Sequence, residues 1–370
     1  MVQGAVIARV AAPADNDALV ELSVACPMEG DIGLAIDRAP DFFAMNRLEG
    51  TSWQVGVVDG PDARPVGCIA VADRDIYVNG HPRPAMYISD LRVHPAHRGR
   101  GVAHALIVWA RDACIAAQGP QALAFLTVLA GNRSMARLMQ GRRGLPVMTR
   151  VATLRSHTIP LLWRRGLPAD GAVTVAAALP DHLPEMAALW ARLASRRQFA
   201  PVHDSASMAA WIEDAPGLDV SDYLVARRPG GALAGFLGIW DQSAVKRLRV
   251  TGYSRRLGAV RVAFNALGPA VGATPLPPPG GALRNLTAVQ VCAPPDDPTV
   301  LRALVRHAHN AHRARGFSFL NVGLDVTDPL AAGLTGLLAQ PTDVWVAVVT
   351  LAETPPLLDG RPSYLELALA

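Results

Sequence analysis

The segment SDLRVHPAHRGRGVAHALI (89–107) constrains the fold of this chain more than any other. An alternating apolar stretch that ends at Val93 predicts a strand, the turn HPAHRGRG follows, and an amphipathic helix begins directly after it. Glycine lets the backbone approach a ligand closely and adopt left-handed dihedral angles. The start of a helix leaves backbone N–H groups unpaired and carries a partial positive charge. The segment therefore predicts an anion site, suited to a pyrophosphate, at a strand-to-helix turn.

The elements around this turn alternate between strands and helices. We expect strands over 5–10, 53–58, 66–78, 85–93, 122–129 and 147–157, and helices over 15–25, 40–48, 101–117 and 134–141. A single crossover helix between the strands 85–93 and 122–129 predicts that these two run parallel in a mixed α/β sheet. The turn is neither a P-loop nor a Rossmann turn, because both GK[ST] and GxGxxG are missing.

Length and composition limit the remaining classes of protein. The 370 residues fit two domains. Hydrophobic residues make up 51% of the chain, yet no apolar run reaches the roughly 18–20 residues of a membrane-spanning helix, and we find no secretory signal. The four cysteines lie far apart without a CxxC pair, so we expect neither a disulfide framework nor a metal site. These features predict a protein of the reducing cytoplasm.

Positive charge in this chain is almost entirely arginine, and Lys246 is the single lysine. No acidic residue lies between Asp112 and Asp170, or between Asp241 and Asp296. Such acid-free stretches suit an anionic ligand, either a phosphorylated cofactor or a nucleic acid. A coding bias toward arginine and alanine explains the same excess without any ligand.

The second half of the sequence repeats the first, weakly but in order. The pairs of similar segments are 5–23 with 172–190, 53–73 with 223–241, 88–95 with 286–294, and 125–132 with 319–326. We therefore predict two copies of one domain type, over 1–158 and 172–370, joined by a linker at 159–171 that contains breaker residues. The second copy carries an insertion near 243–282.

The segment 89–107 resembles motif A of the GCN5-related N-acetyltransferase (GNAT) superfamily, V-x-P-x-x-[RQ]-x-x-G-x-[GA]. The matching residues here are Val93, Pro95, Arg98, Gly101 and Ala103. The order of elements over about 5–158 matches too, with Asn132 opening a short helix as in the family's N-x-x-[AS] region. The resemblance implies an α/β fold of two GNAT-like mixed-sheet domains in tandem, with an intact acyl-CoA motif A in the N-terminal copy.

The resemblance also implies that acetyl-CoA, or another acyl-CoA, lies in a V between the strands 85–93 and 122–129. Leu91 and Val93 would pair through their backbones with the pantetheine arm, and Asn132 would contact the arm or an ordered water. The pyrophosphate would be held by backbone N–H groups beside Arg98, those of Gly99, Arg100, Gly101, Val102 and Ala103. The implied reaction is direct transfer of the acyl group to a primary amine of a small molecule or a lysine-like acceptor.

A base is needed, because a primary amine is mostly protonated at neutral pH. Asp90 is one candidate, since it lies beside the residues expected to pair with pantetheine. Glu29 and Asp31 are others, in the loop where the family binds acceptors. Each has a structural alternative, an arginine-paired strand carboxylate for Asp90 and a solvated or helix-capping group for the two loop acids.

The general acid is unassigned by the sequence. Many family members place a tyrosine seven residues after the asparagine, where this chain has Met139. Tyr87 is the nearest alternative, but a packed strand tyrosine is the simpler interpretation. Unassisted departure of the thiolate also fits. Met139 favours a rival hypothesis as well, an acyl-CoA-binding sensor or partner protein without turnover.

The second copy lacks the anion loop. APPDDPTV (293–300) stands where the first copy has HPAHRGRG, and Asp296 and Asp297 would repel a pyrophosphate. We expect residues 172–370 to be a degenerate copy that binds no CoA and either shapes the acceptor pocket or forms a dimer interface. A third hypothesis, a nucleic-acid-associated module, depends on the basic segment 246–261, which has no recognised nucleic-acid motif.

Overall fold

The computed structural model describes residues 6–141, 144–166, 173–351 and 357–370. Its first half contains the strands β1 (Arg9–Val10), β2 (Ile32–Asp37), β3 (Ser52–Asp59), β4 (Pro65–Val78), β5 (His81–Val93), β6 (Ala124–Leu129) and β7 (Met148–Pro160). The helices of this half are α1 (Asn16–Ala25), α2 (Ala44–Glu49), α3 (Val102–Gln118) and α4 (Arg133–Leu138). These bounds confirm the predicted alternation, with β2 as the one strand of this half that we did not expect.

The second half contains the strands β8 (Thr174–Ala177), β9 (Tyr223–Arg227), β10 (Leu233–Trp240), β11 (Arg247–Tyr253), β12 (Asn285–Cys292), β13 (Phe319–Asp325) and β14 (Gln340–Val349). Its helices are α5 (Leu183–Ala194), α6 (Ser205–Asp214), α7 (Arg255–Leu267) and α8 (Pro298–His312). None of the helices among the described residues has the length and apolar character needed to cross a bilayer.

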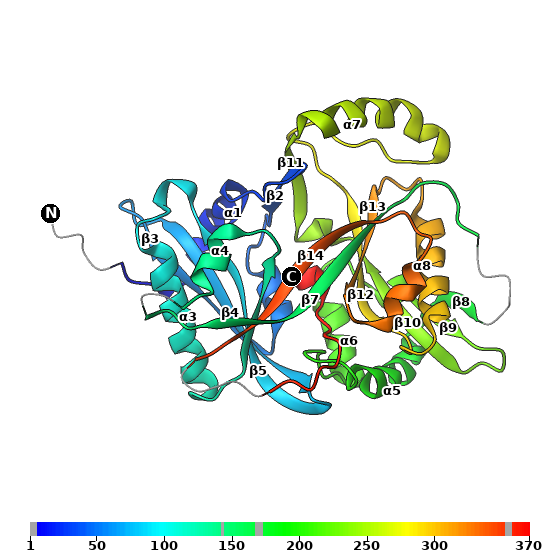
Figure 1. Cartoon of the computed structure of the whole chain (residues 1–370), viewed down its shortest axis with the longest axis horizontal. Coiled ribbons are helices and arrows are strands. Elements are labelled where there is room, and N and C mark those ends of the chain that lie inside the picture. The colour runs from blue at the N-terminus through cyan, green and yellow to red at the C-terminus, as the bar shows by residue number, and fades with distance from the viewer. Residues whose placement is uncertain (1–5, 142–143, 167–172, 352–356) are drawn as a thin grey trace.

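One mixed sheet of 12 strands runs through both halves of the described chain, in the order β1-β3-β4-β5-β6-β14-β7-β13-β12-β10-β9-β8. The centre of this sheet is made by a strand exchange, visible in the middle of Figure 1. β14, from the end of the chain, lies between β6 and β7 and is antiparallel to both. β7 in turn pairs with β13 of the second half. Each half therefore completes the sheet of the other.

The predicted boundary between the two domains falls within a continuous sheet. The linker expected at 159–171 begins within β7, and its part from 167 onward lies outside the described residues. Division of the chain into 1–158 and 172–370 stays a prediction about sequence ancestry, because hydrogen-bonded strands cross that boundary.

The two halves share one internal plan. In the first, α3 connects the parallel strands β5 and β6, and in the second α8 connects the parallel strands β12 and β13. Both leading strands contain a residue with left-handed backbone, Asp90 (φ 54°) in β5 and Gln290 (φ 47°) in β12, next to a shift in pairing register. Repetition of such an irregularity supports two GNAT-like copies in tandem, because a bulge re-aims a strand at one specific point.

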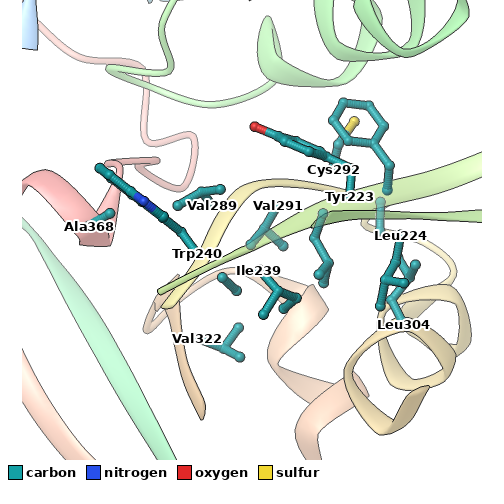
Figure 2. Close-up of a cluster of buried hydrophobic side chains, with 14 of the residues drawn as sticks. Tyr223, Leu224, Ile239, Trp240, Val289, Val291, Cys292, Leu304, Val322 and Ala368 are labelled. Carbon is teal, nitrogen blue, oxygen red and sulfur yellow. The ribbon is translucent and has the colours of Figure 1, made fainter. Parts of the chain in front are cut away.

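Separate hydrophobic cores lie on the two halves. In the first half, α3 packs its buried Leu106 and Ile107 against Ile69, Val71 and Ile88 of the sheet. In the second half a larger core gathers around Trp240, Tyr223 and Leu304, as Figure 2 shows. Burying each such side chain contributes roughly 1.5–3 kcal/mol, so each half is anchored by its own apolar layer.

The insertion expected near 243–282 contains β11 and α7, and it contacts the other half. β11 forms a separate antiparallel ladder with β2, in which Val250 lies opposite Leu34. Arg249 fixes this ladder through an ion pair of 2.8 Å with Asp37. The insertion therefore packs against the loop that leads from α1 into β2.

Candidate active site

Strands β5 and β6 pair over a short stretch, in the middle of β5 and at the start of β6. Met86, Tyr87 and Ile88 lie opposite Ala124, Phe125 and Leu126, and no pairing with β6 follows. From Ser89 to Val93 strand β5 is hydrogen-bonded to β4 alone. The bulge at Asp90 marks the point of separation, and aspartate is one of the few residues that tolerates the left-handed region. Leu91 and Val93 thus lie on a strand edge that β6 leaves open.

The start of α3 lies next to this opening and has no side-chain cap. Gly101 is the N-cap residue with a φ of 85°, and Gly99 has a φ of 76°. A Cβ atom on Gly99 would meet nothing within 4 Å among the described atoms. The N–H groups of Val102 and Ala103, in the first turn, have no carbonyl partner within the helix, and the helix dipole favours an anion at this end.

Two arginines flank this helix start. Arg98 and Arg100 are both exposed, and the Nε atom of Arg98 donates to the carbonyl of Val93 at 3.3 Å. The turn and the helix start thus combine glycines, uncapped amides and positive side chains, which is the donor set that a pyrophosphate requires.

Asn132 lies at the start of α4, as predicted. Its Oδ1 atom accepts a hydrogen bond of 3.0 Å from the backbone N–H of Met135, so this side chain caps the helix. Met139 follows at the end of α4 and is buried in the core beneath α3. A thioether donates no proton, and the position of the family's tyrosine therefore supplies no acid here.

Asp90 lies at the centre of a buried ionic cluster. Its carboxylate forms ion pairs with Arg38 and with Arg92, the latter at 3.0 Å, and accepts a hydrogen bond of 3.2 Å from the amide of Asn46. Burial favours the neutral acid, but the two guanidinium groups hold the pKa of Asp90 far below its ordinary value. So acidic a carboxylate is a weak proton acceptor near neutral pH, which favours the structural alternative for Asp90, an arginine-paired strand carboxylate.

Glu49, at the end of α2, is the better proton acceptor. It is 4% exposed, and its Oε2 atom accepts hydrogen bonds from the Ser89 hydroxyl at 2.8 Å and from the Asn46 amide at 3.2 Å. Burial, helped by repulsion from Asp90, raises the pKa of Glu49 to about 7. A carboxylate with this pKa is available as a base near neutral pH.

Sequence reasoning missed Glu49 because acidic residues near helix ends are usually solvated. One signal was available in the spacing of the predicted second helix. Met45 and Glu49 follow i, i+4 spacing, which places both on one helical face. Met45 is buried, so the same face carries the glutamate inward.

Comparison with known proteins agrees with this geometry. Residues 19–144 match the model of the Acetyltransferase (GNAT) family. This segment is a GNAT domain. A search of curated protein sequences finds no match.

Several solved structures share the fold of the whole chain. N-myristoyltransferase of Saccharomyces cerevisiae with bound myristoyl-CoA superposes with a TM-score of 0.62, at 12% identity, over 90% of this chain and 79% of that one. A GCN5-related N-acetyltransferase of Sphaerobacter thermophilus gives 0.60 at 15% identity, over 95% and 97%. A GCN5-related glucosamine N-acetyltransferase region of a fungal multi-domain β-N-acetylglucosaminidase gives 0.58 at 14% identity, over 94% and 38%. At these identities the likeness is one of fold.

The acidic loop of the GNAT domain lies at the surface, outside the buried cluster. Glu29 and Asp31 are both exposed. The carbonyl of Asp31 accepts a hydrogen bond of 2.9 Å from the N–H of Ser254, the residue that precedes α7. The insertion of the second half thus holds the far end of this loop, while Glu29 has no ion pair to any residue that the structure describes.

The second half also reaches the buried cluster of the GNAT domain. Lys246 donates to the carbonyl of Ala368 at 3.3 Å. Desolvation and the charge of Arg38 lower the pKa of this lysine to about 8. The short helix Leu367–Leu369 lies beside Tyr87, whose hydroxyl donates to the carbonyl of Leu369 at 3.4 Å. The cluster is therefore closed by residues from both halves.

Tyr87 is a poor source of the missing proton. Its hydroxyl lies 3.0 Å from the Thr127 hydroxyl, and the guanidinium of Arg74 stacks 4.1 Å from its ring. Burial, with the charge of Glu49, raises the pKa of Tyr87 to about 12. This exceeds the pKa of an ordinary thiol, so transfer to a leaving thiolate is unfavourable.

In the second copy, the backbone groups beside the bulge have hydrogen-bond partners from the C-terminal segment. The N–H of Gln290 donates to Glu366 at 2.9 Å, and the N–H of Val291 donates to the Tyr364 hydroxyl at 3.2 Å. These two residues correspond to Asp90 and Leu91 of the first copy. The C-terminal segment thus satisfies the backbone groups beside the second bulge.

The helix start of the second copy is also occupied. Asp297 caps α8 by accepting from the N–H of Thr299 at 3.3 Å, and it forms an ion pair of 2.7 Å with Arg228. Both observations support the prediction that the second copy binds no CoA.

No group of histidine, cysteine, aspartate or glutamate within the described ranges is arranged to hold a metal ion.

Proposed function

We propose that this protein is an acyltransferase that moves an acetyl (acyl) group from acetyl-CoA to a primary amine. The observation that carries the proposal is the coincidence of two features in the GNAT domain. The open edge of β5 beyond Ile88 lies directly before the uncapped, glycine-containing start of α3. One extended ligand with a pyrophosphate at one end and a flexible arm at the other fits both features.

In this proposal the amides of residues 99–103 hold the pyrophosphate, and Arg98 adds positive charge beside it. The pantetheine arm runs along the open edge of β5 and pairs with the backbones of Leu91 and Val93. The arm then brings the thioester to the bulge at Asp90, next to Ser89 and Glu49.

The chemistry follows from the groups at that point. The amine nitrogen attacks the thioester carbonyl carbon, a C–N bond forms, and the C–S bond breaks. Ser89 takes the amine proton while its own hydroxyl proton passes to Glu49, along the hydrogen bond of 2.8 Å that already exists. The thiolate leaves unassisted and is protonated by water, because a thiol of pKa about 8.5 is a moderately good leaving group.

Asp90 has a positioning role in this scheme. Its ion pairs with Arg38 and Arg92 hold the segment before α2 against the bulge. Its negative charge also raises the pKa of Glu49. Lys246 adds a compensating positive charge from the second half.

The acceptor in this proposal is a small molecule or a lysine-like amine. Glu29 and Asp31 supply negative charge at the surface loop, which suits a cationic acceptor. Because the four cysteines are free thiols, we propose the reducing cytoplasm as the compartment.

A panel experiment tests the function. The purified protein is mixed with acetyl-CoA, or with longer acyl-CoAs, and with a series of amines, and free thiol is measured. Acceptor-dependent release supports the acyltransferase. Acyl-CoA binding without release from any amine supports the second candidate, a non-catalytic acyl-CoA sensor, which Met139 at the family's acid position favours.

Three of the positive side chains on which the nucleic-acid hypothesis depends are engaged within the protein. Arg247 and Arg249 of the basic segment 246–261 are committed to Asp37, and Lys246 is turned inward to Ala368. The segment therefore presents fewer free positive charges than its sequence indicates.

A further inference from the structure

Helix α7 (Arg255–Leu267) lies at the outer edge of the molecule, away from the 12-stranded sheet, at the top of Figure 1. Its inner face is fixed to the following segment. Asn265 makes two hydrogen bonds with the backbone of Leu276, of 2.9 and 2.7 Å, and Arg261 donates to the same carbonyl at 3.1 Å. Phe264 packs on the small core of Val250, Leu276 and Leu283. The helix is thus a firmly attached platform.

The outer face of α7 is apolar. Its exposed side chains are Ala259, Val260, Val262, Ala263, Ala266 and Leu267. Val260 is 52% exposed, Val262 68% and Leu267 72%. Residues 259, 262, 263 and 266 follow i, i+3, i+4 and i+7 spacing, so they form one continuous stripe. A surface helix normally turns such a stripe toward the core, whereas α7 turns it outward.

The charged residues that α7 itself carries are all arginines. Arg255 and Arg256, in the first turn, are exposed and have no ion-pair partner among the described residues. The helix dipole disfavours cations at this end, so helix stability does not explain them. No acidic residue occurs from 242 to 295 to neutralise them.

We propose that the outer face of α7 docks on an anionic lipid bilayer. The stripe enters the boundary between headgroups and acyl chains, and Arg255 and Arg256 pair with lipid phosphates. With 13 residues the helix lies in the interface and does not span it. A bilayer is favoured over a second copy of this chain, because the α7 face of a second copy offers no acidic residue to pair with Arg255 and Arg256, whereas lipid phosphates do.

Docking has a consequence for the acceptor that depends on the proposed function. Ser254, at the start of α7, is hydrogen-bonded to the carbonyl of Asp31 at 2.9 Å. The loop that carries Glu29 and Asp31 is therefore held beside the start of α7, and docking brings its carboxylates near amines at the lipid surface.

Vesicle co-sedimentation of the full chain tests the docking. We expect binding to vesicles of phosphatidylglycerol and phosphatidylcholine in equal parts, and none to phosphatidylcholine alone. The variant Val262→Glu/Leu267→Glu should weaken partitioning about tenfold, and Arg255→Glu/Arg256→Glu should do the same. Leu338→Glu, at another exposed leucine (54%), is the matched control and should bind as the wild type does. Thermal melts confirm that each variant is folded.

Three results would overturn the proposal. These are absence of binding to the anionic vesicles, equal binding by the α7 variants, and a concentration-dependent dimer in solution that Val262→Glu/Leu267→Glu dissolves. Thiol release with a soluble amine in the absence of vesicles tests the acyltransferase separately. Failure of one proposal therefore leaves the other intact.

Discussion

Replacing Glu49 by glutamine removes a buried charge without changing the side chain's shape. Burial raises the pKa of Glu49 from an ordinary 4.5 to about 7. One pKa unit corresponds to about 1.4 kcal/mol, so ionising this group in the folded protein costs about 3 kcal/mol. Because the folded pKa is raised, the stability that the neutral acid provides is complete below pH 4.5 and is lost as the pH rises through 7.

Glu49→Gln should therefore melt like the wild type near pH 5 and be more stable by about 3 kcal/mol at pH 8. Turnover should move in the opposite direction. Loss of a general base typically lowers the rate by about 10²–10⁴-fold. The inflection near pH 7 in the wild-type profile of kcat/KM should disappear. The profile should be measured with two amines of different pKa. An inflection due to deprotonation of the acceptor moves with the pKa of the amine, whereas an inflection due to Glu49 stays near pH 7.

Glu366→Gln is the matched control. Burial raises the pKa of Glu366 to about 7 as well, but its partners are Gln290 and Tyr364 of the second half. This variant should gain stability at high pH and keep the inflection. Wild-type turnover by Glu49→Gln at pH 8, or an unchanged inflection near pH 7, would refute the assignment of the base.

Three further outcomes follow from the site. Arg98→Glu should weaken acetyl-CoA binding at least about tenfold in calorimetry, because it places negative charge at the helix start, whereas Asp296→Asn should leave it unchanged. Gly101→Val should also lose binding, since a β-branched residue is strained at a φ of 85°; equal affinity would show that the turn holds no ligand. Arg38→Gln should destabilise the protein by about 3–5 kcal/mol in urea unfolding, because the buried Asp90 loses a charged partner, and an effect under 1 kcal/mol would contradict the cluster.

Local pattern was sufficient for most elements of the first half and for the anion turn. Alternation and glycine placement predicted β3 to β6, α3 and the left-handed turn at Gly99 and Gly101, because each depends on neighbours in sequence. β2 was missed because the strand with which it forms a ladder, β11, lies in an insertion more than two hundred residues away. No local signal reports such a pairing.

The candidate site shows the same limit. The position of Asp90 at the site could be predicted, but its chemistry could not, since its pKa depends on Arg38, which approaches from the segment before α2. Glu49 gained its character from burial, which only the assembled cluster provides. The sequence therefore predicts the geometry of the glycine turn, whereas the pKa values that distinguish Asp90 from Glu49 depend on contacts that only the folded chain makes.

The interleaving of β7 and β14 explains why a copy without a nucleotide loop is retained. β14 supplies hydrogen-bond partners to both β6 and β7, and β6 is one wall of the proposed coenzyme V. A chain shortened to its first half would present two bare strand edges at its catalytic centre and would be prone to self-association. The second half thus serves as a scaffold from which the GNAT domain cannot be excised without loss of β14.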